Sequence, residues 1–331
     1  MNHFWENKQV LVTGAGGFIG SHLVEALLVR GARVRAFVRY TSRKDPGFLR
    51  MISAEDFTKL EIIAGDLRDE HAVRSAVKDC QVVFHLGALI SIPYSYVHPV
   101  EVASTNFMGT LNILTACREH GVERLVHTST SEVYGTARQV PINEGHPLQG
   151  QSPYSASKIG ADKLAESFYC SYNLPVVTVR PFNTFGPRQS ARAVIPTIIT
   201  QALAADTIKL GSLTTTRDFT YVADTVRGFL QAAEANQVDG QVYNLGTGAE
   251  ISISDLAQKI IRMLNRPVKI ELASERLRPE PSEVLRLLSD NSLALQQLGW
   301  HPECTLDQGL EQTIAWIRDH LDLYNVGTYE Y

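Results

Sequence analysis

The stretch VLVTGAGGFIGSHLVEALL, residues 10–28, joins an apolar run to an amphipathic run through three regularly spaced glycines. Gly14, Gly17 and Gly20 let the backbone turn tightly and present the amides of a helix N-terminus to a pyrophosphate. A glycine triplet alone could mark only a turn. The strand-turn-helix frame around these glycines favours dinucleotide binding.

Apolar runs and helical stretches alternate through the first half of the chain. The runs include KQVLVTG, RVRAFV, LEIIAGD, QVVFHLGA, RLVHTST and PVVTVRP. This pattern predicts an α/β fold, a Rossmann doubly wound parallel sheet covered on both faces. We expect residues 1–180 to form the NADP-binding domain, with 223–247 returning to it, and residues 181–331 to form a smaller α/β domain that binds the substrate. Ligands of such folds bind in the crevice between the two.

Composition excludes several classes of protein. The 331 residues are 44% hydrophobic, enough for a large core and roughly two domains. Thirty-one basic and 35 acidic residues give a formal charge of -4, which argues against nucleic-acid or membrane partners. Cys80, Cys117, Cys170 and Cys304 are too scattered for a zinc site or a disulfide framework, so we expect free thiols and no metal. With no signal peptide or apolar span, a cytoplasmic protein is expected.

The segment AFVRYTSRK follows the second expected strand, where an acidic residue normally binds the adenosine ribose of NAD. Val38 occupies that place. The residues after it include Arg39, Thr41, Ser42, Arg43 and Lys44. Their cationic and hydroxyl side chains suit a 2′-phosphate. NADP is therefore expected rather than NAD, with a basic solvated loop as the alternative interpretation. Asp66 closes the third strand and is expected to meet the adenine.

The stretch SPYSASKIGADKLAESF begins as a turn and continues as a helix, which places Tyr154 and Lys158 on one face. A phenol has a pKa of about 10, but a neighbouring ammonium and an oxidised nicotinamide both favour the phenolate. Tyr154 could then accept a hydroxyl proton while hydride leaves for the cofactor. Chance could place a tyrosine and a lysine four residues apart, yet the phosphate turn upstream favours a catalytic pair.

The motifs TGAGGFIG, TST and YSASK resemble those of the extended short-chain dehydrogenase/reductases that act on nucleotide sugars. The resemblance covers almost the whole chain. It implies that Thr130 hydrogen-bonds the reacting oxygen of the sugar and that Asn106 supports the site from the sheet core. In RPFNTFGPR and RDFTYVAD, it implies that Asn183 and Arg217 lie around the diphosphate, with structural loop roles as the alternative.

The triplet Thr130-Ser131-Glu132 resembles the Thr-Ser-Glu of GDP-mannose 4,6-dehydratases. In such enzymes, oxidation at C4 acidifies the C5 proton, a carboxylate removes that proton, the C6 hydroxyl leaves as water, and the stored hydride goes to C6. The resemblance implies that Glu132 is the C5 base. Because the hydroxyl of Ser131 is a weak acid, Glu132 is also expected to protonate the departing oxygen.

Two further segments resemble the GDP-mannose dehydratases. VRYTSRK is similar to their NADP-binding loop, and RLRPEPSEV is similar to their nucleotide-binding RPTEV segment with two extra residues. This implies that Arg278 and Glu283 contact the nucleotide. The chain also resembles bacterial dehydratases of legionaminic-type pathways, so UDP- or GDP-N-acetylglucosamine is the expected substrate. The alternatives are a UDP-glucuronate decarboxylase, which shares TSEVYG, a nucleotide-sugar 4-epimerase, and a non-catalytic NADP-sensing module.

The resemblance also implies a cofactor that is tightly bound and recycled, NADP or alternatively NAD. Its expected contacts are Gly14, Gly17, Phe18, Ile19, Gly20, Arg39, Thr41, Ser42, Arg43, Asp66, Leu67, Leu86, Ala88, Asn106, Tyr154 and Lys158. Related enzymes dimerise through the helices that carry the catalytic pair, and some tetramerise near the cofactor loop. A homodimer or homotetramer is therefore expected.

Overall fold

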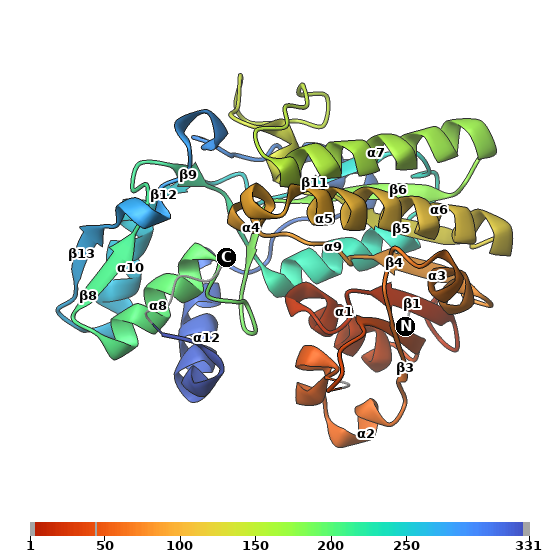
Figure 1. The fold of residues 1–331 in the computed structure, drawn as a ribbon, viewed down its shortest axis with the longest axis horizontal. Coiled ribbons are helices and arrows are strands. Elements are labelled where there is room, and N and C mark those ends of the chain that lie inside the picture. The colour runs from red at the N-terminus through yellow and green to blue at the C-terminus, as the bar shows by residue number, and fades with distance from the viewer. Residues whose placement is uncertain (1–3, 44, 327–331) are drawn as a thin grey trace.

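The computed structural model describes residues 4–43 and 45–326, and a seven-stranded sheet forms its centre (Figure 1). The strands lie in the order β11-β6-β5-β4-β1-β2-β3. Their bounds are β1 (Gln9–Thr13), β2 (Arg33–Arg39), β3 (Glu61–Gly65), β4 (Val82–His85), β5 (Arg124–Thr128), β6 (Val176–Pro181) and β11 (Val242–Leu245). Every neighbouring pair is parallel. This architecture confirms the doubly wound α/β prediction, with the reversal of strand order between β1 and β4.

Helices cover both faces of this sheet. They are α1 (Phe18–Val29), α2 (Ala54–Phe57), α3 (Glu70–Val77), α4 (Ile92–Val97), α5 (Pro99–Ala103), α6 (Gly109–His120), α7 (Pro153–Tyr172) and α9 (Val222–Glu234). Figure 1 shows α6 and α7 along one face and α1 and α9 along the other. Alternate residues of one strand serve the two sides, since Leu11 packs with α3 and α6 whereas Val10 and Val12 pack with α1.

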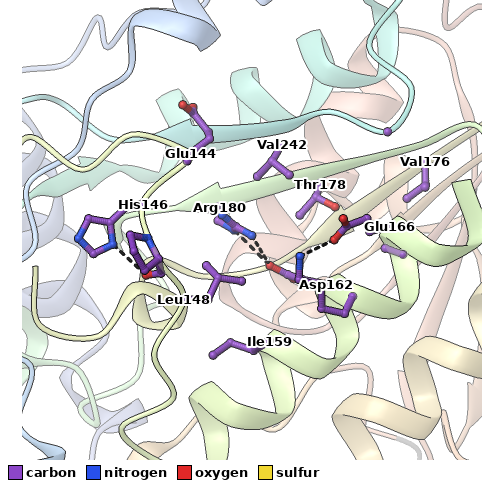
Figure 2. A pocket seen from close by; sticks show the side chains of 15 residues that line it. Glu144, His146, Leu148, Ile159, Asp162, Glu166, Val176, Thr178, Arg180 and Val242 are labelled. Atoms are coloured by element: carbon purple, nitrogen blue, oxygen red, sulfur yellow. Dashed lines mark hydrogen bonds and ion pairs between the residues drawn. The ribbon is translucent and has the colours of Figure 1, made fainter. Parts of the chain in front are cut away.

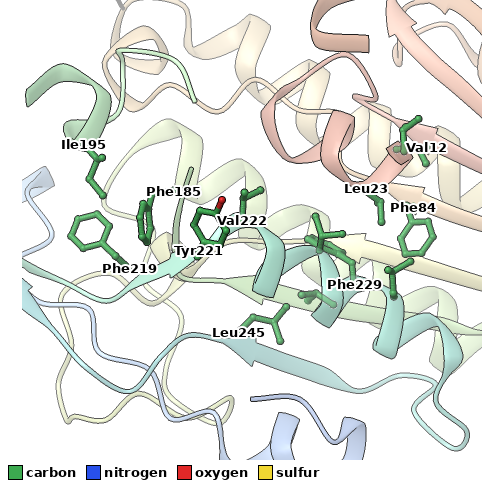
Figure 3. Packing of buried hydrophobic residues seen from close by; sticks show 14 of the residues in the cluster. Val12, Leu23, Phe84, Phe185, Ile195, Phe219, Tyr221, Val222, Phe229 and Leu245 are labelled. Atoms are coloured by element: carbon green, nitrogen blue, oxygen red, sulfur yellow. The ribbon is translucent and has the colours of Figure 1, made fainter. Parts of the chain in front are cut away.

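The second half of the chain builds a smaller α/β region beside the sheet. Its strands are β7 (Asn183–Phe185), β8 (Thr207–Leu210), β9 (Thr216–Arg217), β10 (Phe219–Tyr221), β12 (Ile251–Ser252) and β13 (Lys269–Leu272), and its helices are α8 (Val194–Ala204), α10 (Ile253–Leu264), α11 (Ser292–Leu298) and α12 (Leu306–Asp319). The strands form the pairs β10-β7, β12-β9 and β13-β8. One apolar cluster runs from Val12 and Leu23 to Phe185 and Phe219, so the two regions share a core (Figure 3).

Helix α7 has strong start and stop signals. Ser152 and Ser155 form a capping box, in which each side-chain oxygen accepts a hydrogen bond from the other residue's backbone amide, and Pro153 follows the cap. The helix ends at Asn173, whose φ of 52° is left-handed. The capping box therefore fixes the first turn, which carries Tyr154.

The four cysteines are free thiols. Within residues 4–43 and 45–326, no helix combines the length and the apolar composition needed to cross a bilayer. The same part of the chain contains no cluster of three or more histidine, cysteine, aspartate or glutamate side chains arranged to hold a metal ion.

Replacing Ser152 with alanine removes the side-chain cap of α7. We expect this change to lower the free energy of unfolding by about 1 kcal/mol, because the backbone amide of Ser155 loses its acceptor. Urea denaturation measures the effect. The control is Ser167→Ala, an exposed site later in α7, where a change within about 0.5 kcal/mol is expected. Equal losses in both variants would contradict the role of the cap.

Candidate functional site

The glycine turn between β1 and α1 is closely packed. Gly14 has a φ of +67°, and a Cβ there would lie 2.9 Å from the backbone of Gly87, which follows β4. A Cβ on Gly20 would lie 2.2 Å from the Gly14 carbonyl oxygen. Gly17 is the N-cap of α1 and provides no side-chain cap, which leaves the first amides of α1 without a side-chain acceptor at the carboxyl edge of the sheet. Phe18 and Ile19 form the first turn of this helix.

The loop after β2 returns to this turn. The Phe48 amide donates to the Gly16 carbonyl at 2.9 Å, and a Cβ on Gly16 would lie 2.5 Å from the Pro46 carbonyl oxygen. The loop side chains Thr41, Ser42 and Arg43 are exposed, while Lys44 lies outside the described residues. The expected 2′-phosphate loop therefore borders the glycine turn, with its hydroxyl and guanidinium groups open to solvent.

Arg39, at the end of β2, has a carboxylate partner that the sequence did not suggest. Its side chain lies 3.4 Å from Glu101 of α5, and Glu101 also accepts a 2.5 Å hydrogen bond from the Tyr94 hydroxyl. The guanidinium remains two-thirds exposed, with a side-chain exposure of 67%. A cofactor phosphate and Glu101 would therefore compete for the same cation.

Asp66 and three apolar residues follow β3 and β4, of which β4 lies beside β1 and β3 lies beyond β2. Arg68 Nη2 donates a hydrogen bond to Asp66 Oδ2 at 2.6 Å, and hydrogen bonding by the Arg68 side chain is the largest cause of the lowered pKa of Asp66. Leu67 is buried, and its side chain would touch a Cβ on Gly87 at 2.8 Å. Leu86 and Ala88 flank Gly87 and are half-buried. The structure thus brings these four candidates to one edge of the sheet.

Asn106 lies in a π-helical turn, η2 (Ser104–Met108), and is 1% exposed. Its amide nitrogen donates to the Leu89 carbonyl and to Ser157 Oγ, both at 3.0 Å, and its oxygen accepts from the Leu89 amide at 2.8 Å. Asn106 therefore ties the segment after β4 to α7, close to the catalytic candidates.

The predicted catalytic group comes together where β5 ends against α7. Thr130 is the N-cap of a short helix, η3 (Ser131–Tyr134), and its hydroxyl accepts from the Glu132 amide at 3.2 Å. The Thr130 hydroxyl also hydrogen-bonds the phenol of Tyr154. Lys158 Nζ donates to the Thr128 carbonyl at 2.6 Å. Both Tyr154 and Lys158 are buried.

Burial governs the titration of this pair. It lowers the pKa of Lys158 to about 8. It also raises the pKa of Tyr154, and the charge of Glu132 adds to that rise while the hydrogen bond from Thr130 opposes it. Lys158 and an oxidised nicotinamide were together expected to favour the phenolate, and in the protein without cofactor desolvation is the largest influence on this pKa. The base form of Tyr154 therefore needs a further positive charge beside it.

Glu132 and three other charged side chains form a chain of alternating sign. Glu132 is half-buried, and its charge acts on both Tyr154 and Arg217. Burial lowers the pKa of Arg217, while Glu132 and Glu283 oppose this. Glu283 lies 3.4 Å from Arg217 and 3.6 Å from Arg278. Two arginines and a carboxylate thus face the site from the second region of the chain.

Asn183, the remaining predicted substrate residue, opens β7. Its side-chain oxygen is buried and accepts no hydrogen bond from any described residue. Buried polar atoms normally have partners, so this oxygen is free to meet a ligand or a water. Ser131, the first residue of η3, is also buried, at 3% exposure.

A buried polar network next to the catalytic pair was missed by the sequence reasoning. Asp162, one turn beyond Lys158 on α7, accepts hydrogen bonds from His127, Ser129 and Arg180. Two features of the sequence could have indicated it. Asp162 lies four positions after Lys158, and His127 and Ser129 occupy alternate positions at the end of an apolar strand. Burial of an ionised carboxylate requires such partners.

A cavity of about 520 Å³ lies against the other side of this network (Figure 2). Its walls come from α7, β6, β11 and residues 144–148, and Asp162 and Arg180 contribute to them. Tyr154 and Lys158 are not among its lining residues. The cavity is thus separate from the catalytic group.

Comparison with known proteins identifies relatives over almost the whole chain. The family model described as GDP-mannose 4,6 dehydratase matches residues 11–313. A UDP-glucose 4-epimerase from Mycolicibacterium smegmatis is 34% identical, covering 94% of this chain and 99% of that protein. The human dTDP-D-glucose 4,6-dehydratase is 30% identical, covering 95% of this chain and 91% of that protein. Close relatives therefore differ in the reaction that their names state.

A solved structure shows the same fold with a cofactor. The dTDP-glucose 4,6-dehydratase DesIV from Streptomyces venezuelae, solved with NAD bound, has a TM-score of 0.86 and 28% identity to this chain. The match covers 96% of this chain and 99% of that structure's chain. It supports a nicotinamide cofactor for this chain.

Replacing Gly14 with alanine places a methyl group against the Gly87 backbone. We expect the affinity for NAD(H) and NADP(H) to fall by about tenfold or more, a loss of at least about 1.4 kcal/mol, because the turn must open. Fluorescence titration of the reduced cofactors measures this.

The matched control is Gly121→Ala, since Gly121 has a φ of +62° and nothing within 4 Å of an added Cβ. That variant carries a similar backbone strain of about 1–2 kcal/mol but should bind the cofactor like the parent. Parental cofactor affinity in Gly14→Ala would show that the turn does not hold the dinucleotide.

Proposed function

The chain belongs to the GDP-mannose 4,6-dehydratase family, and from this premise we propose that it is a nucleotide-sugar 4,6-dehydratase. The match confirms the family resemblance read from TGAGGFIG, TST and YSASK. The protein is an enzyme of the nicotinamide-dependent dehydratase and epimerase group. The observation that carries the finer proposal is Glu132, a half-buried carboxylate whose charge acts on Tyr154. An epimerase that only moves a hydride out and back has no need of a second base.

The first step is oxidation at C4. Tyr154 accepts the proton of the C4 hydroxyl, and Thr130 orients the same oxygen through its own hydroxyl. The Lys158 ammonium, held by the Thr128 carbonyl, stabilises the negative charge on the phenol oxygen. A bound nicotinamide would supply the hydride chemistry, as acceptor of the C4 hydride and as donor of hydride to C6. The buried state of Tyr154 and Lys158 keeps water away from this exchange.

The second step is loss of water. The C4 ketone makes the C5 proton acidic, so that Glu132 can remove it and pass it to the departing C6 hydroxyl. Ser131 offers only a hydroxyl, which is too weak an acid for that task. Hydride then adds to C6, and a proton from groups that exchange with solvent adds to C5, giving the 4-keto-6-deoxy sugar. The overall change is the loss of one water, with no net oxidation.

Residues 181–331 are proposed to hold the nucleotide end of the substrate, with 223–247 belonging instead to the cofactor-binding domain. Arg217 and Arg278 provide cations for the diphosphate, and Asn183 provides an unpaired acceptor nearby. Glu283 is paired with both arginines, so the diphosphate must take over those cations, which frees Glu283 for the ribose hydroxyls. The proposed substrate is UDP- or GDP-N-acetylglucosamine.

NADP is the proposed form of the cofactor. Val38 provides no carboxylate for the adenosine ribose, and Arg39 lies next to it with its side chain largely exposed. The pairing of Arg39 with Glu101 weakens this preference, and a similar structure holds NAD. NAD therefore remains the alternative.

A cytoplasmic homodimer or homotetramer is proposed for the assembly. A subunit contact along α5, η2 and α7 is supported by the exposed apolar side chains of Val100, Phe107, Met108 and Tyr172. Four free thiols suit a reducing compartment.

A 4-epimerase is the second candidate, because the relative that is 34% identical bears that name. A UDP-glucuronate decarboxylase is the third, through the shared TSEVYG. Mass spectrometry after incubation with UDP- and GDP-N-acetylglucosamine, GDP-mannose, dTDP-glucose and UDP-glucuronate separates the three. Loss of water supports the dehydratase, unchanged mass with an altered sugar supports the epimerase, and loss of carbon dioxide supports the decarboxylase.

Replacing Glu132 with glutamine keeps the shape of the side chain but removes the base. We expect loss of water to become undetectable while bound cofactor is still partly reduced, because C4 oxidation needs Tyr154 and not Glu132. Mass spectrometry and the near-ultraviolet absorbance of the reduced nicotinamide follow the two steps. The control is Glu144→Gln, a partly buried carboxylate outside the catalytic group, which should still eliminate water. Parental product formation by Glu132→Gln would refute the role.

Replacing Arg39 with alanine tests the cofactor preference. We expect the dissociation constant for NADPH to rise by about tenfold, about 1.4 kcal/mol, and that for NADH to stay within about twofold, because only NADPH carries the 2′-phosphate. Arg33→Ala, an exposed arginine at the other end of β2, is the matched control and should change neither constant. Equal weakening of both cofactors by Arg39→Ala would argue against a phosphate contact.

A further inference from the structure

Three consecutive residues at the carboxyl end of β5 are tied to α7. His127 Nε2 and Ser129 Oγ lie 3.1 and 2.8 Å from the Asp162 carboxylate, and Lys158 donates to the intervening Thr128 carbonyl at 2.6 Å. Alternate strand residues share a face, as do helix residues four apart, so these contacts join one face of each element. They set the position of β5 along α7.

Asp162 is the centre of this junction. Arg180 on β6 donates to the same Oδ2 atom as Ser129, through Nε at 3.1 Å and Nη2 at 2.9 Å. The carboxylate is 4% exposed, and Figure 2 shows it facing Arg180 at the wall of the cavity. Burial opposes its ionisation, but the hydrogen bond from His127 and the charges of Arg180 and Lys158 lower its pKa to about 2. Asp162 is therefore a fixed negative charge.

We propose that Asp162 is a positioning residue of the catalytic group, which clamps the His127–Ser129 segment onto α7 and supplies the negative charge that faces Lys158. The segment leads directly into Thr130 and Glu132, so the clamp sets where these two side chains lie relative to Tyr154. The proposal rests on the proposed roles of Thr130, Tyr154 and Lys158.

The other charged or titratable groups near Lys158 leave this task to Asp162. They are His85 on β4, His127 on β5, Arg180 on β6, Tyr154 on α7 and Glu132 on η3. Burial lowers the pKa of both histidines, so the rings are neutral at working pH. Arg180 is already paired with Asp162. None of these five groups contributes to the shift in the pKa of Lys158, which burial lowers and the charge of Asp162 raises.

The sign of the pH effect follows from these contacts. Lys158 loses its proton above a pKa of about 8, and the phenolate of Tyr154 loses its cationic partner in the same range. Replacing Asp162 with asparagine removes the influence that raises this pKa. In the pH profile of the rate of C4 oxidation, the alkaline limb, where the rate falls as pH rises, should then move to lower pH by about one unit or more. A purely structural loss would lower the rate at every pH and leave the limb in place.

The main experiment compares Asp162→Asn with Glu166→Gln in the full-length protein. Glu166 lies one turn further along α7 and is exposed, so its variant removes the same charge outside the network. Two-dimensional NMR of protein labelled with ¹³C-lysine reports the pKa of Lys158, whose resonance is identified by its absence in Lys158→Met. Asp162→Asn should lower this pKa by about one unit or more, and Glu166→Gln should leave it unchanged. An unchanged pKa in Asp162→Asn, or an equal shift in both variants, would overturn the proposal.

Ser129→Ala tests the clamp by itself and also serves if Asp162→Asn does not fold. It removes one hydroxyl donor to Asp162 and no charge. We expect kcat for C4 oxidation to fall by about tenfold, with KM and the pKa of Lys158 unchanged, because Thr130 loses its support. Parental kcat in Ser129→Ala would contradict the clamp.

These readouts separate the inference from the proposed function. The NMR titration needs no substrate, and reduction of bound cofactor precedes water loss. A parent protein that oxidises the sugar without losing water would refute the dehydratase proposal. The NMR titration and the rate of cofactor reduction would still test the role of Asp162.

Discussion

The buried charges between α7 and β5 are the constraint on which the rest of the site depends. Lys158 and Asp162 lie one turn apart on α7, and both are at most 4% exposed. A charge in such a place is tolerated only with close polar partners, and here the partners are the last residues of β5 and Arg180. The helix therefore has little freedom to slide along the strand without leaving a charge unpaired.

The chemistry of the site follows from this fixed junction. The chain leaves β5 directly into Thr130 and Glu132, so a hydroxyl and a carboxylate arrive beside Tyr154 at one edge of the sheet. The glycine turn of β1 opens at the same edge, as expected for parallel strands around a switch point. Arg217 belongs to the second region of the chain and provides a positive charge to the site. Glu132 lies near enough to influence the pKa of Arg217.

The sequence was informative where a local pattern has a fixed structural consequence. The glycine spacing at 14, 17 and 20 and the apolar runs predicted the parallel sheet, and the Tyr154–Lys158 spacing placed these two residues on one face of a helix. The place of Thr130 beside Tyr154 was implied by the family resemblance and not by any spacing. The sequence failed where partners are distant along the chain, as for Glu101 beside Arg39 and Arg180 beside Asp162. The burial that raises the pKa of Tyr154 was not foreseen either, because it depends on packing that no spacing reveals.

The central claim is that a temporary ketone at C4 lets Glu132 remove the neighbouring C5 proton. The most direct measurement is incubation with the nucleotide sugar that the protein consumes in deuterated water, followed by mass spectrometry and NMR of the product. The account predicts loss of water together with one deuterium at C5, because the proton added there comes from solvent-exchanged groups. A product that has lost water but carries only the original hydrogen at C5 would contradict it, as would a sugar that keeps its C6 oxygen.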